Sequence, residues 1–531
     1  MLRIAAILYA LLIPGSVLAQ PAPAADGDVR LLKFPHPYSS ALTVQSDMDG
    51  ADVAKFQAVH RLINSTERID RDCETWKLLL GDPAIDRDPA WKDGFRGFGL
   101  PFSDSVMMYR PAGLGVFASF DYQTGQPVPQ GVGGRDMRDY VDEWFGRGWI
   151  DTLHTFGPGD LRRQAAQAGV DWLHAKPGRK LKIWVNHSIT ATPVCLGPYR
   201  EPALKIIVKN TVKFMLNRPR PANRELPMDF RESSYPIISF PVGQRLSTWS
   251  MLVAFLLSTL GLLTCAVIRP LRTRRNLLVA VGVMVVLGLG LWFLGLNYAL
   301  GDKPYSPYYV ADLLRPDFRY YWLVVDVPGC RGSVPDQLWL PENKLNGRDT
   351  VLGVYTLYDG APVLVYGRNY KGRGGLQSLE LLTAENLQDL CNRQGTSIIY
   401  THWTGEPKTV FTAKALEGLA QLRRFYGGGK VWLARTVDLL DFTYARTFLD
   451  YQVRQDGGKR LIDIRRINTP LGPAEVPQID DLSGISFDCP SDMPLEVLID
   501  GKPVPAGTVK TIPGNVRTII QFPLRPGAKP G

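Results

Sequence analysis

The sequence predicts an α/β protein built on a parallel (β/α) barrel, interrupted by a transmembrane helical hairpin and followed by a small C-terminal β-sandwich. Three observations lead to this fold class. Apolar strand-like runs alternate with helix-patterned segments, which favours a parallel sheet or barrel. Two long uncharged apolar runs lie in the middle of the chain. Short strands separated by Gly and Pro turns occupy its end, and the 531 residues allow two or three folded units.

The barrel is expected in two segments, 31–203 and 303–451, on either side of the apolar runs. In the first segment we expect strands at 41–45, 149–153 and 181–185, and helices at 52–64 and 161–168. In the second we expect strands at 320–325, 351–355, 397–400 and 430–434, and helices at 384–392 and 413–425. The β-sandwich is expected at 454–523.

The N-terminus has the pattern of an export signal. An apolar stretch follows Arg3, and small residues lead to Ala19 ahead of Gln20. We therefore predict that residues 1–19 form a signal peptide; an uncleaved anchor is the alternative, although the stretch is short for a membrane span. Both interpretations place residue 30 outside the cytoplasm.

The two apolar runs, 248–268 and 277–296, are each long enough to cross a bilayer as a helix. The turn between them, RPLRTRR, is strongly basic, which is typical of a cytoplasmic loop. The segment 248–296 is therefore expected to form two transmembrane helices. The protein is accordingly predicted to be a two-pass protein of the inner membrane, with both large parts on the extracytoplasmic side.

The formal net charge of +10 does not predict a nucleic-acid partner, because the chain carries an export signal. Basic residues gather in the cytoplasmic turn and at 204–216, where Lys205, Lys209 and Lys213 recur every four residues. This helix-patterned segment belongs to an expected membrane-proximal insertion at 204–247. It either lies on the membrane surface or is an ordinary surface helix. Membrane lipid is therefore an expected partner.

The six cysteines do not indicate a redox or zinc-finger site. Cys265 falls inside the first apolar run, and the other five lack CxxC spacing. Five is an odd number, so at least one of these thiols is expected to be unpaired, and a structural disulfide among the others stays open.

Polar residues directly follow several of the expected strands. Asp47 and Asp49 follow the first strand, and His154, His187 and His402 each follow another. Chemistry in barrels of this kind lies where strands end and loops begin. Carboxylates and imidazoles at separate strand ends can converge on one divalent ion and leave positions for water. Adjacent acids rarely share one role, so Asp49 is assigned as a ligand, Asp47 as a base and His402 as an acid.

These residues resemble the motifs of the NodB-type polysaccharide deacetylases. VQSDMDG resembles their opening TFDDG motif, which implies that Asp47 is the catalytic base and Asp49 binds the metal. LHTFGPGD resembles their next motif through His154, and His187 in WVNHS is our assignment for a further ligand. IIYTHW resembles the late motif and gives His402. RPDFRYYWLVVD and GGKVWLARTVDLLDF are similar to the family's mid-barrel strand and to its final strand and helix.

The resemblance implies a barrel of polysaccharide-deacetylase type and a metal site of Asp49, His154 and His187. Zinc is the expected metal, with cobalt or nickel as alternatives. The implied function is metal-dependent deacetylation of a cell-envelope or exported polysaccharide. We expect Arg368, after the strand-like VLVYG, and Trp403 to bind this substrate. Envelope polysaccharide machinery is a candidate partner.

Several alternatives stay open. Asp47 and Asp49 also fit N-caps of the following helix, and each histidine after a strand also fits a structural or sugar-stacking residue. The whole chain also fits a catalytically inactive carbohydrate-binding or assembly component of an export system, or a glycoside hydrolase with two carboxylates. The other histidines are assigned to structure or surface: His36, His60 and His174.

Overall fold

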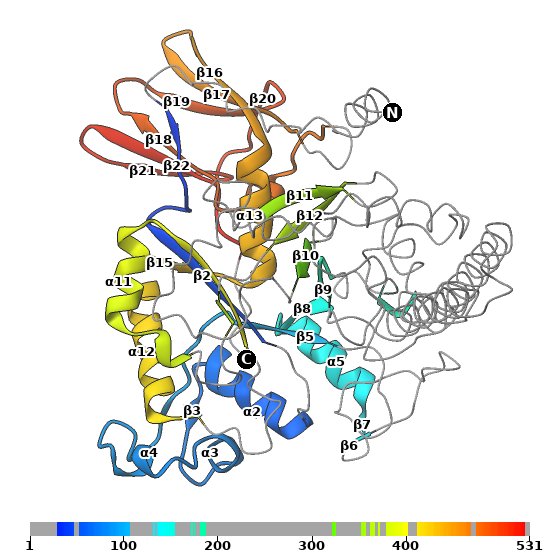
Figure 1. Ribbon diagram of the computed structural model, residues 1–531. Coiled ribbons are helices and arrows are strands. Elements are labelled where there is room, and N and C mark those ends of the chain that lie inside the picture. Colours follow the sequence, from blue (N-terminus) through cyan, green and yellow to red (C-terminus); the bar gives the residue numbers. More distant parts are fainter. Residues whose placement is uncertain are drawn as a thin grey trace, which may run out of the picture. The chain divides into compact units, whose positions relative to one another are not determined.

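The computed structural model describes residues 29–46, 52–106, 131–132, 135–153, 171–173, 175, 181–186, 321–324, 352–356, 362–366, 370–371, 379–401, 411–468 and 474–525. They divide into two compact units (Figure 1). The first unit contains the residues up to Pro37 together with Asp441–Arg525, and the second contains Tyr38–Leu440.

A ten-stranded sheet organises the described residues of the second unit, in the order β11-β12-β10-β9-β8-β5-β2-β14-β13, with β15 pairing with β2 off this path. The strands are β2 (Ser40–Ser46), β5 (Ser103–Val106), β8 (Ile150–Leu153), β9 (Ile183–Asn186), β10 (Tyr321–Val324), β11 (Leu352–Thr356), β12 (Pro362–Tyr366), β13 (Tyr370–Lys371), β14 (Thr396–Thr401) and β15 (Val431–Leu433). Every pair is parallel except β11 with β12. Strands from both segments of the chain thus form one sheet.

One face of this sheet is covered by three helices, α2 (Val53–Asn64), α11 (Ala384–Asn392) and α12 (Ala413–Gly427). Leu42 and Val44 of β2 belong to the same buried apolar cluster as side chains from each of these helices. Because side chains alternate along a strand, Thr43 and Gln45 point to the opposite face.

Side-chain caps define where these three helices begin. Asp52, Thr383 and Thr412 each accept a hydrogen bond from the backbone N–H three residues further on. The expected strands and helices that fall on described residues are confirmed as elements, with shifts of one or two residues at their ends. The expected helix at 161–168 lies outside the described residues.

Between α2 and β5 the chain makes an excursion that the sequence patterns did not predict. It contains the hairpin of β3 (Arg68–Ile69) with β4 (Phe95–Arg96), and the short helices α3 (Glu74–Leu79) and α4 (Pro83–Arg87). A second excursion before β8 contains β6 (Gly131–Val132), β7 (Arg135–Asp136) and α5 (Met137–Gly146). The last helix, α13 (Thr436–Phe448), begins in the second unit and continues into the first.

The first unit contains two four-stranded sheets. One consists of β1 (Arg30–Leu31), β18 (Ser486–Pro490), β22 (Arg517–Gln521) and β21 (Lys510–Pro513). The other consists of β16 (Leu449–Asp456), β17 (Lys459–Ile467), β19 (Leu495–Ile499) and β20 (Lys502–Pro503). The 3-10 helix η7 (Ile479–Leu482) lies between β17 and β18 in sequence. The unit thus begins before residue 454, the start of the expected β-sandwich. It also includes β1, from the N-terminal part of the chain.

The fold class expected from the sequence, a barrel of polysaccharide-deacetylase type interrupted by a transmembrane hairpin and followed by a β-sandwich, is wrong. The chain is a mixed α/β protein with several sheets, and its parallel strands form a half-barrel. The antiparallel edge strand β11 and the short β13 end the path of described strands. No described helix is long and apolar enough to cross a membrane. The expected signal peptide, the insertion at 204–247 and both apolar runs lie outside the described residues.

Candidate functional site

The residues predicted to act in chemistry or substrate binding lie outside the described residues. They are Asp47, Asp49, His154, His187, Arg368, His402 and Trp403. The strands that precede them are described: β2 ends at Ser46, β8 at Leu153, β9 at Asn186 and β14 at Thr401. These four strands run parallel in one sheet, so their carboxyl ends lie at the same edge.

The register of β2 relates two of the predicted residues. Ser46 is the partner of Thr401 on β14 and of Asp104 on β5. Asp47 and His402 are therefore the next residues in sequence after two positions that pair directly.

The alternative role of Asp47 and Asp49 as helix caps is taken by another acid. The N-cap of α2 is Asp52, whose carboxylate accepts the N–H of Lys55 at 2.6 Å. The N-cap residue of α2 is therefore Asp52, and Asp47 and Asp49 lie outside the described residues.

On the face of the sheet opposite the helices, buried polar side chains connect three neighbouring strands. Gln45 Nε2 of β2 donates to Thr152 Oγ1 of β8 at 2.6 Å, and reaches across β5 to do so. Ser103 and Ser105 of β5 are small and fully buried, and they leave room for this crossing. The Thr152 hydroxyl in turn donates to Asp151 Oδ1 at 2.7 Å. The carboxyl edge of the sheet is thus joined by side chains as well as by backbone.

Asp151 occupies a β-bulge. Asp104 pairs with Ile150 and Ser105 pairs with Thr152, so Asp151 is an extra residue opposite β5. Its Oδ2 accepts the backbone N–H of Val437, in the first turn of α13, at 3.0 Å. Arg435 precedes α13 at the N-cap position, and an arginine side chain carries no hydrogen-bond acceptor. Asp151, 286 residues away in sequence, therefore accepts the N–H of Val437 in its place.

The pKa of Asp151 is raised, and the largest cause is its burial. The hydrogen bonds from Val437 and Thr152, the positive charge of Arg435 and the nearby hydroxyl of Ser103 each act in the opposite direction. A second contact holds the same helix start, because the hydroxyls of Thr43 and Thr436 lie 3.0 Å apart.

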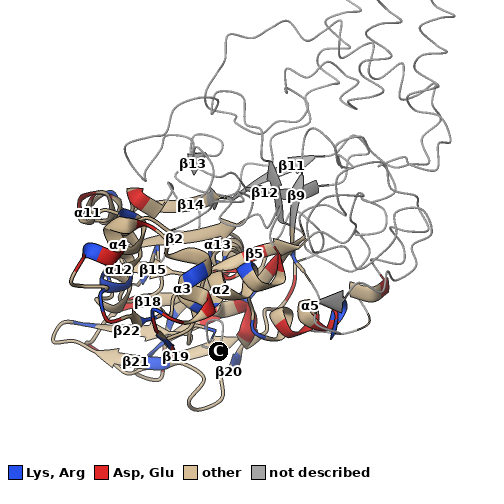
Figure 2. Ribbon diagram, turned by 90° about the horizontal axis from the view of Figure 1, so that it is seen from below, with Lys and Arg blue, Asp and Glu red and all other residues tan. Residues whose placement is uncertain are grey.

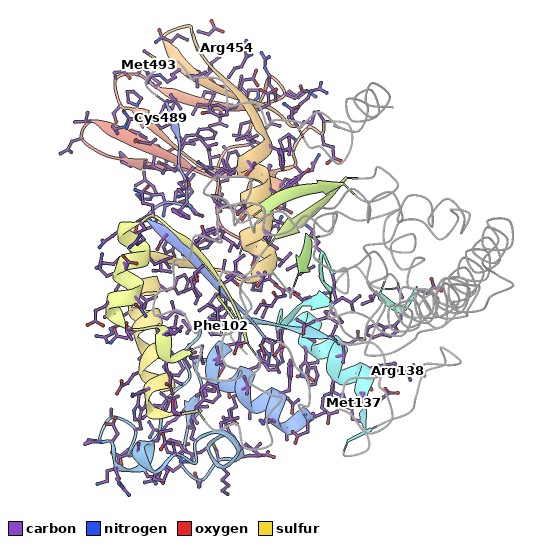
Figure 3. All side chains as sticks on the ribbon, in the orientation of Figure 1. Phe102, Met137, Arg138, Arg454, Cys489 and Met493 are labelled. Atoms are coloured by element: carbon purple, nitrogen blue, oxygen red, sulfur yellow. The ribbon has the colours of Figure 1, made fainter. Side chains whose placement is uncertain are left out.

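On the helix face, His60 of α2 lies against Asp104 of β5. His60 Nε2 is 3.6 Å from Asp104 Oδ2, and both side chains are fully buried. Asn64 donates through Nδ2 to the carbonyl oxygen of Phe102, so its Oδ1 accepts from His60 Nδ1 at 2.7 Å. Phe102 (labelled in Figure 3) is fully buried. The imidazole stacks on Trp149, with centroids 4.9 Å apart.

His60 Nδ1 carries the hydrogen that it donates to Asn64 Oδ1. Its Nε2 faces Asp104 Oδ2 at 3.6 Å, and Asp104 Oδ1 accepts the backbone N–H of Ser105 at 2.8 Å. His60 therefore has a structural role, and it lies beside a buried acid.

Charged residues of both signs are interspersed along the described helices (Figure 2). Several form ion pairs within one helix or at its end, as Arg393 does with Asp389 and Arg147 with Glu143. Such exposed pairs stabilise a helix by a few tenths of a kcal/mol, roughly. The absence of a nucleic-acid partner stays a prediction.

Among the described residues, no group of three or more His, Cys, Asp or Glu side chains is placed to hold a metal ion. The described cysteines, Cys73, Cys391 and Cys489, are free thiols. Burial raises the pKa of Cys489 to about 11, so this thiol stays protonated and unreactive at neutral pH.

Comparison with protein-family models, curated proteins and solved structures finds no match to this chain.

Asp104 and Asp151 were not predicted as part of the site. Each is an acid inside a short buried strand, SDSV and IDTL, and both side chains are at most 5% exposed. An acid in an otherwise buried strand is the signal that would have identified them, since buried carboxylates require partners.

Proposed function

We propose that the chain is a metal-dependent deacetylase of a cell-envelope or exported polysaccharide. The observation that carries the proposal is the common direction of β2, β8, β9 and β14. Each of these strands is followed in sequence by a predicted ligand or catalytic residue. Ligand sites in sheets of parallel strands lie at the carboxyl ends of the strands.

Asp49, His154 and His187 are the proposed metal ligands. One carboxylate and two imidazoles suit zinc and leave a position open for water; cobalt and nickel are alternatives. The parallel direction of β2, β8 and β9 supports this set, because the three strands end at one edge of the sheet. A bound divalent ion would polarise the substrate carbonyl and lower the pKa of water.

Asp47 and His402 are the proposed base and acid. Neighbouring strands lie about 4.8 Å apart, so residues that follow a paired position begin close together. The pairing of Ser46 with Thr401 supports placing Asp47 and His402 on the same substrate. Asp47 would take a proton from the attacking water, and His402 would give one to the departing amine or alcohol. Arg368 and Trp403 would contact the sugar.

The test measures bound metal and acetate release in the purified full-length chain after zinc is supplied. We expect about one zinc per chain in the wild type, and its loss in the Asp49→Ala and His154→Ala variants. Asp52→Ala is the matched control, because it removes a nearby carboxylate that caps α2. This control should keep its zinc.

Acetate release from acetylated envelope glycans should fall strongly in Asp47→Ala and in His402→Ala. A well-folded wild type that binds neither zinc, cobalt nor nickel would overturn the proposal. It would favour a catalytically inactive carbohydrate-binding or assembly role instead.

A further inference from the structure

We propose that Asp151 is a positioning residue that holds the carboxyl ends of β2 and β8 and the start of α13 in one arrangement. In this arrangement it fixes where Asp47 and His154 leave the sheet. The catalytic meaning of this inference rests on the proposed function. The structural part rests on the described contacts of Asp151 alone.

Asp151 receives hydrogen bonds from two directions. Its Oδ1 accepts from the Thr152 hydroxyl at 2.7 Å, and its Oδ2 accepts from the Val437 N–H at 3.0 Å. Thr152 also accepts from Gln45 at 2.6 Å. One carboxyl group therefore joins β8 to α13 directly and to β2 through a single hydroxyl.

The ends of this chain of hydrogen bonds lie next to the proposed site in sequence. Gln45 precedes Asp47 by two residues, and Thr152 precedes His154 by two residues. A displacement of Gln45 or Thr152 therefore shifts the backbone that precedes Asp47 or His154, respectively. Residues that do not bind the metal but orient its ligands commonly control metal affinity in this way.

The β-bulge explains why Asp151 can make both contacts. In a regular strand Asp151 and Thr152 would point to opposite faces of the sheet, and their side chains would not meet. The register shift between Asp104 and Ser105 adds one residue to β8 at this point. Bulges re-aim side chains beside functional sites.

A carboxyl group suits this position because the described donors converge on it. The hydroxyl of Ser103 also lies close enough to lower the pKa of Asp151. Arg435 forms its own two-contact pair with Asp438, at 2.8 and 3.0 Å. The contacts of Asp151 are thus made to N–H and O–H groups of separate elements, and they depend on where those elements lie.

The test compares Asp151→Asn with Thr43→Val. Asparagine keeps the size of the side chain, but its NH2 group would face a donor at one of the two contacts. Thr43→Val removes the hydroxyl contact between β2 and Thr436 at the same helix start, and leaves β8 untouched. Matched thermal stability of the two variants separates positioning from general destabilisation. Thr152→Val, which removes only the bridging hydroxyl, replaces Asp151→Asn if that variant does not fold.

Two quantities are measured on the full-length chain: the zinc dissociation constant, and the amide hydrogen exchange of peptides that cover 44–50 and 152–156. We expect Asp151→Asn to weaken zinc binding by about 10- to 100-fold and to speed exchange in both peptides. We expect Thr43→Val to keep the zinc dissociation constant within about twofold. Wild-type zinc affinity together with wild-type exchange in Asp151→Asn would overturn the inference.

The same measurements separate this inference from the proposed function. If the wild type binds no zinc but Asp151→Asn speeds exchange in both peptides, the positioning role stands and the metal-dependent function fails. If the wild type binds zinc and Asp151→Asn changes neither quantity, the function stands and the positioning role is wrong.

Discussion

Asp104 and Asp151 lie on neighbouring strands and are both buried, but they serve opposite faces of the sheet in different ways. Asp104 lies 3.6 Å from His60 of α2 within the helix face, and its Oδ1 accepts the N–H of Ser105 on its own strand. Asp151 meets an N–H and a hydroxyl from separate elements on the other face. These contacts of Asp104 involve α2 and its own strand. Asp151 depends on the relative placement of several elements, so it is sensitive to their movement.

The largest effect is expected from Asp104→Ala, which leaves His60 buried beside an apolar methyl group. Breaking a buried pair by removing one partner costs about 3–5 kcal/mol, and we expect a loss of this size in the free energy of unfolding. Asp104→Asn should cost far less, because its amide can donate to the Nε2 of a neutral imidazole. Urea unfolding of both variants measures the difference. Equal losses would mean that the amide of the Asp104→Asn variant makes no hydrogen bond to His60.

A smaller loss is expected for Asp151→Ala. Its removal leaves the Val437 N–H and the Thr152 hydroxyl buried without their acceptor, and unsatisfied groups cost about 1–3 kcal/mol each. Burial of the acid itself is unfavourable, and its removal offsets part of this loss. We expect the free energy of unfolding to fall by about 2 kcal/mol in the same assay. A loss as large as that of Asp104→Ala would contradict the contrast between the two acids.

The pH dependence distinguishes the two acids further. The pKa of Asp151 is raised above its ordinary value of 3.8 by burial. The stability that this acid contributes is therefore fully present below about pH 4, and it is lost as pH rises through the pKa of the folded state. The difference in unfolding free energy between wild type and Asp151→Asn should fall from pH 4 toward pH 8. A difference that grows with pH would mean that the folded state favours the ionised form.

The smallest effect is expected from Asp52→Ala. Asp52 accepts the N–H of Lys55 at an exposed helix start, whereas Asp151, itself buried, accepts the N–H of the half-buried Val437. Loss of an N-cap costs about 1 kcal/mol. The measured difference between Asp52→Ala and Asp151→Ala therefore shows what burial adds to the same hydrogen-bonding role.

Local patterns predicted most of the described elements of the second unit. The short apolar run ALTVQ predicted β2, and the helix-patterned segments after Thr383 and Thr412 predicted α11 and α12. The excursion at 65–100 was missed because its elements are short, as the five residues of α4 illustrate. Short elements carry too few periods of a hydrophobic pattern to be recognised.

The long-range features were not available from local patterns. The order of the strands, and hence a half-barrel with an antiparallel edge, depends on pairing between distant segments. The same holds for Asp151, whose partner Val437 lies 286 positions away. The site prediction concerned residues just after the strands, and the structure describes the strands themselves.

The pairing of β2 has a consequence for how the chain is made. Its partners β14 and β15 begin at residues 396 and 431. At synthesis rates of about 5–20 residues per second, roughly 20–80 s pass between the emergence of β2 and that of β15. During this interval the central strand, buried throughout in the folded protein, lacks most of its neighbours. The central strand therefore gains its pairing with β14 and β15 only after almost the whole second unit has been synthesised.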